Sequence, residues 1–195
     1  MIKIETQIDY FWSDPHFHHP NVIKFYPNRP GKTIEEHSEE LINIWNSTVQ
    51  PVNAALIAGD FAYKCKKEQV IDTISRMNGS IYFIRGNHDC FWFPNTESEK
   101  DEIRFQCKKY NIYFLDHALL KKQPNTKYGI HVSHYPCESW EGQERGSLHL
   151  HGHLHGEESK LKGLKRFDCG IDNIYKLKGS YNPLSWEDVL LALEK

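Results

Sequence analysis

The sequence lacks the features that mark several classes of protein. No apolar run approaches the ~20 residues that a membrane-spanning helix needs, and the first residues lack the long apolar stretch of a signal peptide. The five cysteines are odd in number, widely spaced and without a Cys-x-x-Cys pair, which argues against a disulfide scaffold or a thiolate zinc cluster. We therefore expect a cytoplasmic protein in a reducing compartment, with no membrane partner.

The sequence also has no large excess of either positive or negative charge. The chain has 24 Lys and Arg against 26 Asp and Glu, a formal net charge of −2. It therefore has no global basic field of the kind that drives non-specific binding to nucleic acid. A local basic patch is still compatible with this balance, and the densest basic run spans residues 160–166.

Histidine is the residue in excess, with 12 among 195 residues. The length favours one domain, which we place at residues 1–195, and 39% hydrophobic residues are enough for a sizeable core. Because no cysteine pattern accompanies the histidines, a thiolate cluster does not account for them. Their positions along the chain are therefore the main clue to function.

Strands and helices alternate in the first half of the chain, and strands dominate the second half. A capping box at Thr33–Glu36 predicts a helix that ends near Thr48. Further helices are predicted at 66–77, 96–110 and from 186 onward, and strands at 7–13, 54–58, 80–84, 112–115, 130–133, 147–150 and 165–171. Residues 116–129 suggest a short hairpin. This order predicts an α/β sandwich with mixed sheets and helices outside.

Five of the predicted strands end in side chains that bind metals. The residues are Asp14 and His16, Asp60, Asn87 and His88, His134, and finally His153 and His155. Ligands of open α/β sheets bind beyond the carboxyl ends of the strands, so these side chains are expected to converge. Imidazole, carboxylate and amide groups together suit Mn, Fe or Zn, and their number suits two ions. A carboxylate between two cations, most simply Asp60, would offset their repulsion.

The order of these motifs resembles the calcineurin-like metallophosphoesterase superfamily. The superfamily pattern is Asp-x-His, Gly-Asp, Gly-Asn-His-Asp/Glu, a later His, and Gly-His-x-His, and all five occur in this order between Asp14 and His155. Ser13 before Asp14 and Arg85 before Gly86 are also similar to the family. The stretch from Trp12 to Phe17 resembles a small branch of this superfamily that is seen in bacteria and phages and has no cap domain.

The resemblance implies both a fold and a reaction. The fold is a four-layer α/β/β/α sandwich of two mixed β-sheets flanked by helices. The reaction is the two-metal hydrolysis of a phosphomonoester or phosphodiester by in-line attack of a hydroxide that bridges the ions. Manganese is the favoured ion, with Fe, Zn, Ni or Mg as alternatives, and the partner is a phosphate-ester substrate.

The resemblance also implies a role for each matching residue. The first ion would be bound by Asp14, His16 and His155, the second by Asn87, His134 and His153, and Asp60 would bridge them. His88 would be the general acid, Asp89 would orient it, and Arg85 would contact a phosphate oxygen. His19, just before a predicted helix start at Asn21, is a further candidate for substrate binding.

Two alternatives to a small-molecule phosphoesterase are kept. The first is a nuclease acting on DNA or RNA, which the charge disfavours but an open site and the basic run allow. The second is a binding scaffold that keeps the fold without catalysis. The ligand motifs do not specify the natural substrate, the native metal or the oligomeric state.

The remaining residues of interest have two interpretations each. His18 either contacts substrate or is an exposed loop residue. His149 and His151 share a strand face with His153, and either support the site or serve packing. We predict that His37 is solvated, that Cys90 is a small buried hydrophobe, and that Trp92 and Phe93 belong to the core.

Overall fold

The computed structural model describes residues 2–121, 123–159 and 162–193, and these residues form two five-stranded sheets. The first sheet has the order β1 (Ile2–Ile4), β6 (His117–Leu120), β7 (Ile130–Ser133), β8 (Leu148–His151) and β9 (Arg166–Asp168). The second has the order β10 (Leu184–Ser185), β2 (Tyr10–Trp12), β3 (Ala54–Ile57), β4 (Ser80–Ile84) and β5 (Ile112–Leu115). Each sheet contains parallel and antiparallel pairs.

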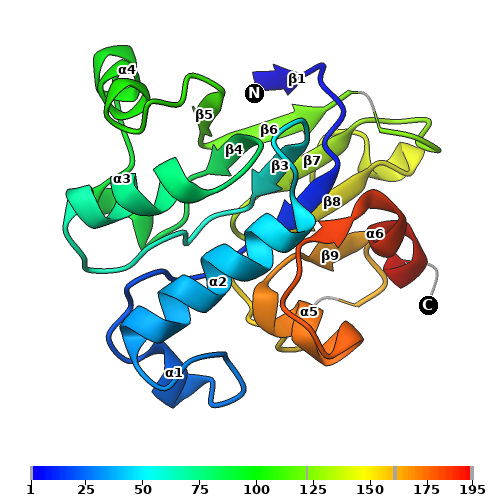
Figure 1. Cartoon of the computed structure of the whole chain (residues 1–195). Coiled ribbons are helices and arrows are strands. Elements are labelled where there is room, and N and C mark those ends of the chain that lie inside the picture. Colours follow the sequence, from blue (N-terminus) through cyan, green and yellow to red (C-terminus); the bar gives the residue numbers. More distant parts are fainter. Residues whose placement is uncertain (1, 122, 160–161, 194–195) are drawn as a thin grey trace.

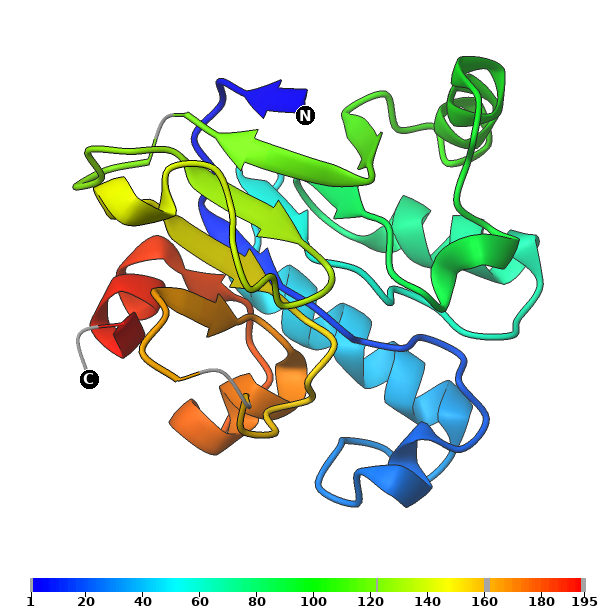
Figure 2. The ribbon, with the colours of Figure 1, turned by 180° about the vertical axis from the view of Figure 1, so that it is seen from behind.

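Helices flank the sheets (Figure 1). They are α1 (Val22–Phe25), α2 (Ile34–Thr48), α3 (Lys67–Arg76), α4 (Glu97–Gln106), α5 (Ile171–Lys178) and α6 (Trp186–Leu193). Thr33 caps α2 as predicted, because its hydroxyl accepts from the Glu36 N–H at 3.2 Å. Helices α2 and α3 lie on one side of the second sheet, and the first sheet faces the viewer in Figure 2. The predicted α/β sandwich of two mixed sheets with flanking helices is confirmed.

The strand order brings the predicted ligand loops to one end of the molecule. Strands β2, β3 and β4 are parallel neighbours in the second sheet, so their carboxyl ends lie along one edge. Strands β7 and β8 are parallel neighbours in the first sheet. The loops that follow β2 and β3 are joined by backbone hydrogen bonds, including the Asp14 N–H to the Gly59 carbonyl at 3.0 Å.

The core contains side chains from both sheets and most of the helices. Trp92 and Phe93 are buried in it, as predicted. The prediction for Cys90 is wrong: a short 3-10 helix at Asp89–Phe91 leaves this cysteine exposed. Among the described residues, no helix combines the length and the apolar character needed to cross a membrane.

His37 is fully buried, which corrects the prediction of a solvated side chain. The turn before α2 folds back over the first turn of the helix, and the His37 ring bonds to the Pro30 carbonyl through Nδ1 at 2.9 Å. Burial, together with the charge of Arg29, lowers the pKa of His37 to about 4. The imidazole is therefore neutral in the folded protein near neutral pH.

We expect His37 to make the fold sensitive to mild acid. Below pH 6.5 the unfolded chain binds a proton at this residue, and the folded chain does not bind it until about pH 4. Stability is thus fully present above pH 6.5 and falls through this window, by about 3 kcal/mol in total. His37→Asn keeps a donor for Pro30 without this titration, so its unfolding free energy should fall less between pH 7 and 4.

The measurement is denaturant unfolding at several pH values for the wild type and the variant. Asn43→Ala on the exposed side of the same helix provides the control, because it removes no titratable group and should leave the pH dependence unchanged. Parallel stability curves for the wild type and His37→Asn would contradict the assignment.

Candidate metal centre

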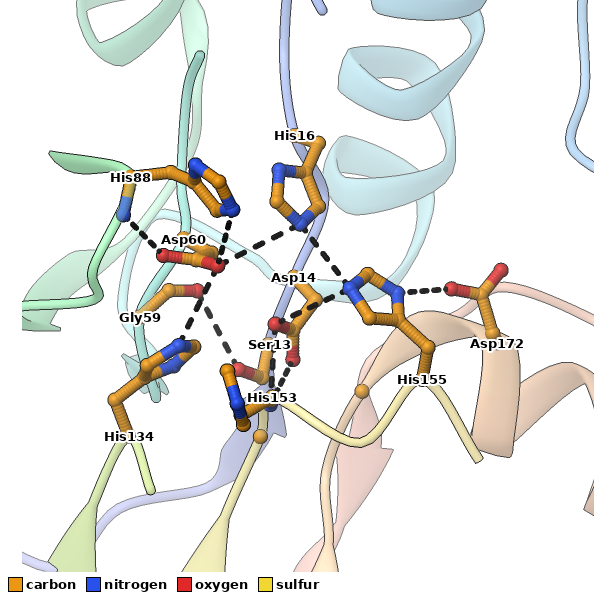
Figure 3. Close-up of polar contacts among 12 residues, drawn as sticks. Ser13, Asp14, His16, Gly59, Asp60, His88, His134, His153, His155 and Asp172 are labelled. Carbon is orange, nitrogen blue, oxygen red and sulfur yellow. Dashed lines mark hydrogen bonds and ion pairs between the residues drawn. The ribbon is translucent and has the colours of Figure 1, made fainter. Parts of the chain in front are cut away.

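The predicted ligands converge where the carboxyl ends of neighbouring strands from the two sheets meet (Figure 3). They come from the loops after β2, β3, β4, β7 and β8. Two groups of three side chains each place one ligand atom per residue within 4.8 Å of the others. These groups are Asp14, His16 and His155, and Asp60, His134 and His153.

The first group is the set predicted for the first ion. Nε2 of His16 lies 3.3 Å from Nε2 of His155, and that atom lies 3.9 Å from Oδ1 of Asp14. Asp14 and His16 are buried. The opposite nitrogen of His155 contacts the Asp172 carboxylate at 2.8 Å, so a proton held there leaves Nε2 free to face the group.

The second group has the same character. Nδ1 of His134 lies 2.9 Å from the Ala58 carbonyl, and its Nε2 lies 2.9 Å from Oδ1 of Asn87. Both ring nitrogens thus face oxygen acceptors and donate to them when the ring is protonated, and loss of the Nε2 proton would free a lone pair there for a metal ion. The ring of His153 lies beside that of His134, with centroids 5.2 Å apart.

Asp60 lies between the two groups. Its Oδ2 is 3.4 Å from Nε2 of His134 and 3.7 Å from Nε2 of His16. The same oxygen is 3.8 Å from Nε2 of His88, while Oδ1 accepts from the His88 backbone N–H at 2.8 Å. One carboxylate therefore faces histidines of both groups and the predicted general acid.

Two glycines permit the loops to approach so closely. A Cβ atom on Gly86 would lie 2.1 Å from Oδ1 of Asp60, and one on Gly152 would lie 2.3 Å from Oδ2 of Asp14. Both distances are far below van der Waals contact. Any larger residue at either position would push the ligand loops apart.

The backbone of the site is strained. Five of the predicted ligands have positive φ angles in the left-handed region: Asp14 (57°), His16 (51°), Asp60 (52°), His153 (71°) and His155 (50°). This conformation costs roughly 1–2 kcal/mol per residue for side chains other than glycine. Strain of this kind gathers at functional sites, where the surrounding structure enforces it.

The electrostatics of the centre show a surplus of acceptors. Burial raises the pKa of Asp14 to about 7. Burial opposes a charge on His134, but its contact with Asp60 and the charge of Asp14 together raise the pKa of His134 to about 9. A proton on His134 thus serves as the cation for the surrounding oxygens. Metal ions would satisfy the same buried acceptors, so the donor set fits divalent cations.

A family model for calcineurin-like phosphoesterases matches residues 10–168. That range contains both groups of ligand-type side chains and spans most of the chain. The chain belongs to the calcineurin-like phosphoesterase family.

Two whole-chain similarities accompany this match. The chain is 30% identical over 192 residues to the uncharacterized protein MJ1445 of Methanocaldococcus jannaschii, covering 95% of this chain and 91% of that protein. Its structure is similar to that of AQ665, a protein of unknown function from Aquifex aeolicus, with a TM-score of 0.62 and 17% identity, covering 96% of this chain and 100% of that one. The Pseudomonas putida nuclease MPE is matched with a TM-score of 0.41 and 17% identity, over 74% of this chain and 60% of that chain.

Asp89 holds the ligand loops together. Its buried carboxylate accepts from the backbone N–H groups of Phe61 and Gly86 at 2.9 and 2.8 Å, and from the Trp92 indole at 2.9 Å. Within the described part of the chain its hydrogen bonds include none to the His88 ring. The predicted orientation of His88 by Asp89 is therefore at most indirect, through the loop.

The predicted substrate-binding residues lie at the rim of the centre. The Arg85 guanidinium bonds to the Pro94 carbonyl and the Asn95 side chain, at 3.1 and 2.9 Å, so it is already engaged by the protein. The His19 ring lies 5.7 Å from that of His16. The helix-dipole reason for His19 fails, because α1 is a single turn of four residues. Their roles in substrate binding stay predictions.

Three residues of the site escaped the sequence analysis. Asp172 contacts His155 and accepts from Arg29 through a buried two-pronged pair at 2.6 and 3.0 Å. Arg29 also donates to the carbonyls of the first ligand loop, including that of Asp14 at 2.9 Å. Tyr63 contacts the rings of His19 and His88, at 4.3 and 4.6 Å between centroids. Gly170-Ile171-Asp172, a glycine ahead of an acidic first turn, is the only local signal of a helix start there.

Proposed function

We propose that this phosphoesterase hydrolyses a phosphomonoester or a phosphodiester with two divalent ions and His88 as the general acid. The arrangement around Asp60 carries the proposal. One buried carboxylate lies between two groups of ligand-type side chains, and the His88 ring lies beside it with 37% of its side chain exposed. A substrate from solvent can therefore reach the acid and the ligands together.

The proposed ligands follow the two groups in the structure. Asp14, His16 and His155 would hold one ion, Asn87, His134 and His153 the other, and Asp60 would contact both. When bound, the two ions activate water for attack on phosphorus and neutralise charge on the phosphoryl oxygens. Nitrogen and oxygen donors of this mixture suit manganese, our preferred ion.

His88 is positioned to supply a proton. Its backbone N–H is bound to Asp60, and Tyr63 packs edge-on against its ring. These contacts hold the imidazole next to the ligands without a metal-binding role of its own. As imidazolium it can protonate the oxygen that departs from phosphorus.

The test is a matrix of metals and substrates on protein stripped with a chelator. Mn²⁺, Ni²⁺, Zn²⁺, Fe²⁺ and Mg²⁺ are each combined with an aryl phosphomonoester, an aryl phosphodiester, a cyclic nucleotide and an oligonucleotide. We expect negligible hydrolysis without metal and recovery with at least one ion, Mn²⁺ foremost, on a mono- or diester.

Two outcomes would favour one of the alternatives, and the first of them would contradict the proposal. Absence of hydrolysis under every combination would favour a binding scaffold with the phosphoesterase fold. Cleavage confined to the oligonucleotide, with steeply salt-dependent binding, would favour a nuclease. The basic run behind that alternative includes residues 160–161, which lie outside the described residues.

A further inference from the structure

A row of histidines crosses one face of the first sheet, and none of them belongs to the metal centre around Asp60 (the Asp60 centre). It consists of His117 on β6, His131 on β7, and His149 and His151 on β8. His131 and His149 are paired across neighbouring strands. Successive ring centroids in the row lie 6.3, 5.1 and 5.4 Å apart. Four of the histidines that the Asp60 centre leaves unused are thus gathered on one face of this sheet, where His149 and His151 are buried.

The chain after β7 returns over this row and brings a cysteine to it. The backbone N–H of Cys137 donates to Nε2 of His149 at 3.0 Å, and the Arg166 guanidinium donates to the Cys137 carbonyl at 2.8 Å. The Trp140 ring covers His149, with centroids 5.3 Å apart. Both flanks of Cys137 are therefore fixed, and its thiol is held beside the two imidazoles.

We propose that His131, Cys137 and His149 form a further metal site, suited to a zinc ion. One ligand atom of each residue lies within 4.8 Å of the other two. The two Nδ1 atoms are 3.2 Å apart. Two nitrogens bound at about 2.0–2.1 Å to one tetrahedral zinc ion would be about 3.3 Å apart. The pair therefore needs little movement to bind.

The ligand chemistry separates this site from the Asp60 centre. A thiolate with two imidazoles selects zinc or another soft to borderline ion over manganese or magnesium. The Asp60 centre has only nitrogen and oxygen donors. The two sites are thus suited to different metals, and the thiolate is a marker found in only one of them.

The site is open to solvent on one side. His131 and Cys137 line a surface pocket of about 400 Å³, which they share with Arg85 and His134. An ion can enter from this pocket. Three protein ligands leave the fourth position of a tetrahedral zinc ion for water or for an anion from the pocket, as in zinc sites that are not purely structural.

The proton balance of binding is simple. Buried His149 is neutral, because burial lowers its pKa to about 3, and neutral imidazole is the form that binds metals. Before binding, Nε2 of His149 accepts from the Cys137 N–H, so the ring proton is on Nδ1. Binding of an ion at Nδ1 would move this proton to Nε2, which would then donate to the Tyr135 carbonyl 3.3 Å away instead of accepting from Cys137. The thiol of Cys137 becomes a thiolate, and its one proton is released.

Cobalt(II) is the probe for this site, used in place of zinc on the whole, metal-stripped chain. Binding should produce a thiolate-to-cobalt charge-transfer band, and added zinc should abolish it. The band should be absent in Cys137→Ser and retained in Cys65→Ser, a matched change at another partly buried cysteine. In His131→Ala, which loses one ligand, zinc affinity should fall about tenfold or more.

The proposal stands apart from the phosphoesterase activity. In Asp60→Asn the band should persist, because the thiolate site does not use that carboxylate. Absence of the band in the wild type would overturn the proposal, as would its persistence in Cys137→Ser. If the two imidazoles were joined only by a hydrogen bond and bound no metal, the wild-type protein would be folded but would show no band.

Discussion

An Asp60→Asn variant is expected to lose most of its bound metal and most of its activity. Asparagine would keep an oxygen to accept from the His88 N–H. It would also place an NH₂ group, which has no lone pair to offer a cation, where Oδ2 now lies 3.4 Å from His134 and 3.7 Å from His16. Losing only a hydrogen-bonding partner of a metal ligand costs about 10–100-fold. Loss of the shared ligand should cost at least about 100-fold in affinity and rate.

Equilibrium dialysis with manganese and initial rates on an aryl phosphate test this expectation together. Asp101→Asn is the control, because that carboxylate is exposed and pairs with a neighbour on α4, Arg104. Circular dichroism separates lost metal from lost fold. Normal occupancy of two ions in Asp60→Asn would remove the bridging role from this residue.

The second large effect is expected for His88→Ala, which should keep its metal and lose turnover. The ring is assigned no ion, so metal content should match the wild type. A positioned general acid contributes about 10²–10⁴-fold, and kcat should fall by that amount. The loss should be greatest for alkyl esters, whose leaving oxygens need a proton, and smaller for nitrophenyl esters, whose oxygens leave readily as anions.

The dependence on the leaving group distinguishes proton donation from a general disturbance of the loop. Tyr110→Ala serves as the control, since that ring is exposed just before β5 and lies outside the site. An equal loss on all esters would indicate positioning instead of acid catalysis. Unchanged activity on every aryl phosphate would remove His88 from the mechanism.

The sequence predicts those strands best whose boundaries are marked locally. The bounds of β4, β5 and β7 agree with the predicted 80–84, 112–115 and 130–133. Each is a short apolar run limited by turn or polar residues. Helix α2 is similarly marked by its cap at Thr33. A single domain over residues 1–195 stays a prediction.

The sequence analysis did not correctly predict elements whose formation depends on segments far away along the chain. Strand β1 has three residues and exists through parallel pairing with β6, far along the chain. The hairpin expected within 116–129 instead joins β6 to β7, across a longer connection. The strand expected at 165–171 ends at Asp168, whose carboxylate accepts from the Gly170 N–H at 2.7 Å. Helix α5 begins shortly afterwards, at Ile171, in a stretch whose apolar pattern resembles that of a strand.

The candidate site likewise has one part that the sequence predicts and another part that it does not. The motifs mark the side chains that converge, because each follows a strand whose direction the topology fixes. The contacts around them are not encoded locally. Arg29 reaches Asp172 across most of the chain, and Asp172 lies on α5, the helix that the pattern misassigned. Residues that hold ligands in place were therefore visible only once the sheets were assembled.

The left-handed backbone conformation of the ligand loops lowers the stability of the fold at the same residues that the proposed function requires. At His153, which is only partly buried, glycine would relieve the backbone penalty and sacrifice little packing. A selection for heat resistance alone would thus favour glycine at a position where the proposed second ion needs an imidazole. Engineering of this chain for thermal endurance should therefore exempt the ligand loops and draw its gains from α3 and α4, on the side of the second sheet remote from β9.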